Sequence, residues 1–167
     1  MKLARSTLEY WALIAEIVGG LAVVISVIYL AMQISENTRV LRSQAHYNAL
    51  SLAQRPFEMA IENDSLSKIL NVCFSTPNKL SDDEWIRCGD YLFMQMNAWE
   101  YLYYQNRDGS IPKELWVGAD ASFKQMIATK AGYSRFWAEW ETAFDEPFRS
   151  YVTREFAKKA LSATTKK

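Results

Sequence analysis

Few side chains in this sequence are of the types that enzymes use for catalysis. His46 is the only histidine in 167 residues. A di-iron site with two Glu-x-x-His motifs cannot form, and any catalytic triad would have to use this one histidine, with no nucleophile-elbow pattern present. Cys73 and Cys88 form neither a CxxC pair nor a metal-ligand spacing. We therefore predict no catalytic residue, no metal site and no cofactor, and hence a protein that is not an enzyme.

The best polar candidates for a site are Glu100, Tyr104 and Gln105. Glu100 and Tyr104 are four residues apart, so they share one face of a helix. They could line a small pocket in an enzyme or a ligand-binding domain. The alternative, which we favour, is a buried carboxylate that is hydrogen-bonded to tyrosine and backbone and holds two helices in register.

Glu16 is the one charged residue in the apolar segment 11–34. A charge at the centre of a bilayer costs about 2.5–3.5 kcal/mol on insertion scales. Because Glu16 follows the interface-type residue Trp11 by only five positions, we favour a carboxylate near the lipid headgroups. The alternative is a ring of carboxylates that faces a pore or a partner helix.

Small and polar residues recur on one stripe of the same helix when it is unrolled at about 100° per residue. The stripe consists of Ala12, Ala15, Gly19, Ala22, Ser26, Gln33, Asn37 and Gln44. Small residues let helices approach closely in lipid, and amides at heptad spacing set register and oligomeric state. The stripe predicts a seam between copies of the chain. One alternative is that the small residues recur by chance within the membrane-spanning part. The other is that the polar residues beyond the membrane lie on a solvated helix face.

The element that must position these residues is a long helix at the N-terminus. Residues 11–34 would reach about 36 Å as a helix, enough to cross a hydrocarbon core of about 30 Å. The uncharged run 17–32 is longer than the core of a usual signal peptide, so we expect an uncleaved anchor after a short tail, residues 1–10. The helix is expected from about Leu8 to Arg55, with a kink or a new start at Pro56. Residues 35–62 form its stem.

Residues 63–160 have the pattern of a small helical bundle, followed by a basic tail, residues 161–167. Ser81 and Glu84 form a capping box that opens a helix ending at Asp108-Gly109. That helix is apolar on nearly all sides, which is typical of a bundle centre. Further helices are expected over 65–74, from 113 to about Gly132, and in two segments after it. With six Trp, nine Tyr and eight Phe, the core needs no disulfide, and the cysteines suit a reducing compartment.

Three segments resemble a widespread family of uncharacterised bacterial single-span proteins. Residues 29–42, YLAMQISENTRVLR, are similar to its Y-L-A-x-Q-[IV]-x-x-N-T motif. Residues 99–116 and 136–152 are similar to two later aromatic blocks of the same family, in the same order. The resemblance implies this architecture, the bacterial inner membrane, and a cytoplasmic C-terminal domain. It implies no activity.

The fold class that we predict is all-α, with a long N-terminal transmembrane and stem helix followed by a small aromatic-rich bundle. The net charge is zero, so nothing in the electrostatics supports nucleic-acid binding. We expect a single-pass, self-associating scaffold or accessory subunit whose partners are the lipid bilayer and either its own copies or another membrane-complex subunit. The alternatives are an oligomeric pore with Glu16 near the conduction path, and third, an enzyme or ligand-binding domain that uses Glu100 and Tyr104.

Overall fold

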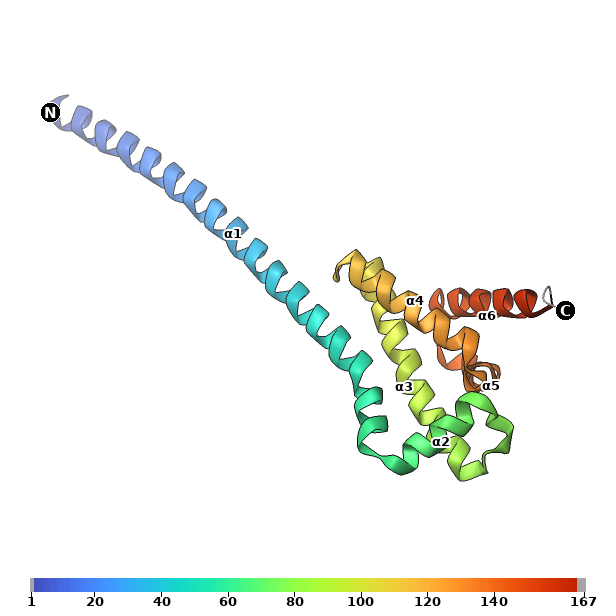
Figure 1. Cartoon of the computed structure of the whole chain (residues 1–167). Helices are drawn as coiled ribbons and strands as arrows, with labels where there is room; N and C mark the ends of the chain where they lie inside the picture. Colours follow the sequence, from blue (N-terminus) through green and yellow to red (C-terminus); the bar gives the residue numbers. More distant parts are fainter. Residues whose placement is uncertain (1, 165–167) are drawn as a thin grey trace. The chain divides into compact units, whose positions relative to one another are not determined.

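The structure is a computed structural model. It describes the backbone of residues 2–164 and the side chains of residues 7–158. The elements along the chain are the helices α1 (Lys2–Glu62), α2 (Asp64–Ser75), α3 (Asp82–Arg107), α4 (Lys113–Thr129), α5 (Ala131–Trp140) and α6 (Phe148–Thr164), with the 3-10 turns η1 (Pro77–Lys79) and η2 (Glu141–Ala143) (Figure 1). No strand occurs within residues 2–164. The all-α prediction is confirmed.

The chain divides into two units, Met1–Ser43 and Gln44–Lys167. The first unit is the N-terminal part of α1, which begins at Lys2, six residues before the expected start at Leu8. No proline or glycine separates these residues from the span, so nothing stops the helix from extending towards the terminus. Part of the expected tail, residues 1–10, is therefore helical.

The apolar surface of α1 is uncovered in the structure. Within Thr7–Glu62 an 18-residue window has a mean hydropathy of 2.4, and none of that window is buried. By length and composition α1 is a candidate membrane-spanning helix.

The second unit, which we call the head, begins with residues 44–62 of α1. Ala49 is 1 % exposed there, and Pro56 is also buried. A kink or a new helix start was expected at Pro56, and α1 continues through this residue to Glu62 without a new start. A proline inside a helix loses one backbone hydrogen bond, and burial of its ring in the head offsets part of that cost.

The expected ends of α3 are confirmed in detail. At its start, the backbone N–H of Ser81 donates to Glu84 Oε2 at 3.0 Å, and the Ser81 hydroxyl accepts from the Glu84 N–H at 3.4 Å, which completes the capping box. At its end, Gly109 has a φ of +68°, the left-handed conformation that terminates many helices.

Helix α3 is the centre of the head and packs against α2, α4 and α5 (Figure 1). Trp99 on α3 is fully buried and stacks on Phe123 of α4, with ring centroids 5.3 Å apart. Phe148 and Tyr151 of α6 contact the same indole edge-on. Aromatic packing of this kind makes Trp99 the point at which α3, α4 and α6 meet.

A disulfide between Cys73 and Cys88 joins α2 to α3, contrary to the expectation of a head without one. Both cysteines are 0 % exposed, and their Cα atoms are 6.5 Å apart. The pairing depends on η1, which reverses the chain between the two helices. The two cysteines are 15 positions apart in the sequence, and that spacing alone does not indicate a pair.

Candidate functional site

The predicted site at Glu100, Tyr104 and Gln105 lies on α3, where all three residues are half-buried. Burial raises the pKa of the Glu100 carboxyl, and the nearby charge of Asp145 raises it further, although a hydrogen bond with the Asp145 backbone opposes both effects. The Tyr104 hydroxyl donates to the backbone carbonyl of Glu146 at 3.2 Å. These contacts hold α3 against the segment that precedes α6.

The charge on Glu100 also acts on its neighbour. Burial raises the pKa of the Tyr104 hydroxyl, and the Glu100 carboxylate adds to that increase. The guanidinium of Arg107 lies over the Tyr104 ring, 4.7 Å from its centroid. Tyr104 is therefore held protonated, and its one proton is donated to the Glu146 backbone carbonyl and not to the Glu100 carboxylate with which the favoured interpretation paired it.

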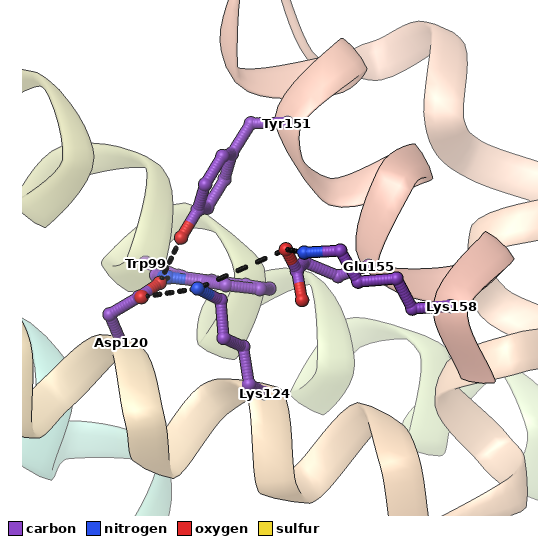
Figure 2. A network of polar contacts seen from close by, with 6 residues as sticks. All are labelled: Trp99, Asp120, Lys124, Tyr151, Glu155 and Lys158. Atoms are coloured by element: carbon purple, nitrogen blue, oxygen red, sulfur yellow. Dashed lines mark hydrogen bonds and ion pairs between the residues drawn. The ribbon is translucent and has the colours of Figure 1, made fainter. Parts of the chain in front are cut away.

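A second polar cluster, not expected from the sequence, is centred on Asp120 of α4 (Figure 2). Asp120 is 9 % exposed. Its Oδ1 accepts hydrogen bonds from Trp99 Nε1 at 3.0 Å and from the Tyr151 hydroxyl at 2.6 Å. Its Oδ2 forms an ion pair with Lys124 Nζ at 2.7 Å. One carboxylate thus ties together α3, α4 and α6 at the point where their aromatic rings already meet.

The cluster continues towards the surface through charges of alternating sign. Lys124 Nζ is 3.9 Å from Glu155 Oε1, and Lys158 Nζ contacts the same oxygen at 2.6 Å (Figure 2). Asp120 and Lys124 are one turn apart on α4, and Glu155 and Lys158 are nearly one turn apart on α6. Two carboxylates and two ammonium groups balance, so the cluster carries no net charge.

The environment of the cluster fixes the protonation of Lys124 and Tyr151. Burial alone would lower the pKa of Lys124, but its hydrogen bonds with Asp120 and Tyr151 and the charge of Asp120 outweigh burial and raise it well above its ordinary value. Burial and the hydrogen bond to Asp120 raise the pKa of Tyr151 to about 12. At neutral pH Lys124 is charged and Tyr151 is protonated, so neither is poised as a general base. The arrangement acts as a clamp between helices.

Sequence reasoning missed Asp120 because its local signal is ordinary. The pair Asp120 and Lys124, four residues apart, looks like a solvated ion pair on a helix surface. The two donors that reveal its burial, Trp99 and Tyr151, are 21 and 31 residues away along the chain. A buried aspartate opposite a tryptophan becomes visible only when the packing of the helices is known.

The expected seam residues are exposed in the structure, and so is Glu16. At Gly19 an added Cβ would meet nothing within 4 Å. Two polar members have partners on their own helix: the Ser26 hydroxyl donates to the Ala22 carbonyl at 2.7 Å, and Gln33 Nε2 donates to the Tyr29 hydroxyl at 3.0 Å. Each of these two side chains therefore has one hydrogen-bond partner without a second chain.

Metal binding has no candidate among the described residues, in which no group of three His, Cys, Asp or Glu side chains gathers. His46 is half-buried on α1, and the two cysteines are joined to each other.

The fold and its polar clusters define a class of protein: a candidate membrane-spanning helix that continues into an aromatic helical head held by internal clamps. Comparisons of the chain with protein-family models, curated proteins and solved structures found no match.

Proposed function

We propose that this chain is a membrane-anchored protein that associates with copies of itself, and whose head is a scaffold or accessory subunit of a membrane assembly. The observation that carries the proposal is the apolar part of α1. Its mean hydropathy is 2.4 over 18 residues, and none of these residues is buried. So much uncovered apolar surface is stable only against lipid or against other helices.

Self-association is supported by the stripe that includes Ala15, Gly19 and Ala22. These side chains are small and exposed, so two helix backbones could approach closely along them. An added Cβ at Gly19 or at Gly20 meets nothing within 4 Å among the described residues outside the adjoining backbone of the same helix. A substitution at one of these glycines therefore reports on contacts between chains and not on packing within one.

The test uses this matched pair of glycines, which lie about 100° apart around the helix. The full-length protein and two variants are crosslinked in lipid vesicles. Gly19→Leu changes a residue on the stripe, and Gly20→Leu changes a residue beside it. We expect Gly19→Leu to reduce the dimer fraction several-fold and Gly20→Leu to leave it unchanged. A monomer at all protein-to-lipid ratios, or equal effects of the two substitutions, would contradict self-association through this stripe.

A second candidate function, an oligomeric pore, is favoured by Glu16. This exposed carboxylate follows Ala12 by four residues, about 40° around the helix, so it would border the seam. A ring of such carboxylates is typical of cation pathways. The measurement is conductance of the protein in planar bilayers, which should change with Glu16→Gln. Bilayers that stay silent would exclude this candidate.

The side of the membrane on which the head lies is a separate proposal. The family resemblance implies a cytoplasmic head, whereas the Cys73–Cys88 disulfide favours an oxidising compartment, because cytosolic proteins rarely keep disulfides. We favour the oxidising side. The test is Gly118→Cys on the exposed surface of α4, with a membrane-impermeant maleimide added to intact spheroplasts. Labelling before lysis supports the oxidising side, and labelling only after lysis supports the cytoplasm.

A further inference from the structure

A pocket of about 460 Å³ opens between α3 and α5 in the head. Its volume falls within the range of about 300–1,000 Å³ that is typical of small-molecule sites. The pocket is separate from the Asp120 clamp and from Glu100, since none of the residues of those clusters lines it. It has no part in the anchoring proposed above.

The apolar wall of the pocket is a set of aromatic rings that contact one another. Phe136 and Trp140 on α5 are stacked with centroids 6.3 Å apart, and Phe93 on α3 meets both of them edge-on. Trp140 is 49 % exposed, although most tryptophans in the head are buried. A half-exposed indole at the mouth of an aromatic pocket offers a ring face to an apolar body or to a cation.

Gly89, within the N-terminal half of α3, also lines the pocket. A glycine in a helix costs about 0.5–1 kcal/mol relative to alanine. Neither close packing nor a positive φ requires glycine here, because an added Cβ at this position meets nothing within 4 Å. The missing side chain leaves this part of the pocket wall bare.

The polar groups of the pocket carry one unbalanced negative charge. Glu139 is neutralised: Oε1 pairs with Arg135 Nε at 3.0 Å, and Oε2 accepts from Trp85 Nε1 at 2.9 Å. Arg135 is fixed in turn, with its guanidinium 3.9 Å from the Trp85 ring centroid. Asp90 is exposed at the pocket and pairs with no described side chain.

We propose that this pocket binds a small amphipathic cation, with an aromatic or alkyl body against Phe93, Phe136 and Trp140 and an ammonium group near Asp90. The aromatic faces and the free carboxylate both favour a positive head over a neutral or negative one. The Arg135–Glu139 pair adds no net charge to the opposite wall, so Asp90 supplies the unpaired charge among the residues that line the pocket.

The test uses the full-length protein in nanodiscs of zwitterionic lipid and three probes with the same phenyl body. These probes are 2-phenylethylammonium, the neutral 2-phenylethanol and the anionic 3-phenylpropionate. Ligand-observed saturation-transfer NMR, corrected with empty nanodiscs, ranks their affinities. We expect the cation to bind more tightly than the alcohol and the anion to bind most weakly. No binding, or equal binding of cation and alcohol, would overturn the proposal.

Two substitutions locate the site. Gly89→Leu should place a bulky side chain in the pocket lining and weaken cation binding at least tenfold, while Gly118→Leu, on an equally open helix glycine outside the pocket, should leave it unchanged. Near-ultraviolet circular dichroism checks that both variants are folded. Asp90→Asn should weaken the cation about two- to fivefold and leave the alcohol unaffected, as expected for one exposed charge. Unchanged cation binding in Gly89→Leu or in Asp90→Asn would contradict the site.

Discussion

Gly132 on α5 lies against Cys73 on α2 so closely that a Cβ on the glycine would be 2.6 Å from the cysteine Sγ and 2.7 Å from its carbonyl oxygen. Real Cβ atoms do not approach other atoms to these distances, and one of the two atoms belongs to the backbone. Helix α5 can therefore pack on α2 beside the disulfide only because residue 132 has no side chain.

Gly132→Ala should therefore destabilise the head. We expect a loss of about 1–3 kcal/mol in the free energy of unfolding, the usual cost of overpacking a core. The measurement is denaturant unfolding of the full-length protein in nanodiscs, followed by near-ultraviolet circular dichroism. Gly118→Ala is the matched control, because a methyl there meets nothing and should be neutral or stabilising. Equal stability of the two variants would contradict the close approach.

The disulfide leads to a prediction about the thiols. Protein purified without reductant and then denatured should react with no thiol-specific maleimide, because Cys73 and Cys88 are its only cysteines and are joined. Cys73→Ala with Cys88→Ala should lower the free energy of unfolding by about 3 kcal/mol, the entropy expected for a closed loop of about 15 residues. Wild-type protein kept in reductant should behave like the double variant. A mass increase of two maleimides on the unreduced protein would show that the pair is not formed.

The Asp120 clamp predicts a graded series. Asp120→Ala removes the acceptor for Trp99 Nε1 and for the Tyr151 hydroxyl. We expect the free energy of unfolding to fall by about 1–3 kcal/mol for each buried donor that is left unpaired. Asp120→Asn keeps one acceptor oxygen and should cost less. Lys158→Gln is the control, because the Lys158 side chain is 69 % exposed and its ion pair with Glu155 should contribute about 1 kcal/mol or less. Thermal unfolding ranks the variants, and Asp120→Ala as stable as Lys158→Gln would show that the clamp contributes little.

Glu100 predicts a pH dependence. Its pKa is raised in the folded head, so as the pH falls from neutral the folded protein takes up this proton before the unfolded chain does. The ionised carboxylate thus costs stability at neutral pH, and that cost disappears below the ordinary glutamate pKa. Glu100→Gln should therefore raise the melting temperature at pH 7, with the gain shrinking towards pH 4.

The control for this series is Glu58→Gln, which alters an exposed carboxylate 3.9 Å from Arg55 and should shift the melting temperature little at either pH. A gain for Glu100→Gln that is the same at pH 7 and pH 4 would mean that the effect does not arise from titration of Glu100.

Local signals explain which features of the head could be predicted from the sequence. The capping box at Ser81 and Glu84 and the turn at Asp108-Gly109 define α3 within a few neighbouring residues, so its limits were predicted correctly. Its apolar faces likewise indicated a buried centre, which the burial of Trp99 confirms.

The features that were missed depend on contacts between distant segments. Gly132 looked like the end of a helix, because glycine commonly plays that role, but the structure uses it for a close approach to Cys73 inside α5. Asp120 was not singled out, because its indole partner, Trp99, is on another helix. No periodicity within one helix reports how two helices are paired.

Anchoring in a lipid bilayer through the N-terminal part of α1 is tested by alkaline carbonate extraction of membranes from cells that express the protein. Carbonate strips peripheral proteins and leaves those anchored by a membrane-spanning helix. The full-length chain should stay in the membrane pellet, and replacing Val24 and Ile28 by lysine should release it. Release of the unmodified chain into the carbonate supernatant would contradict this anchoring.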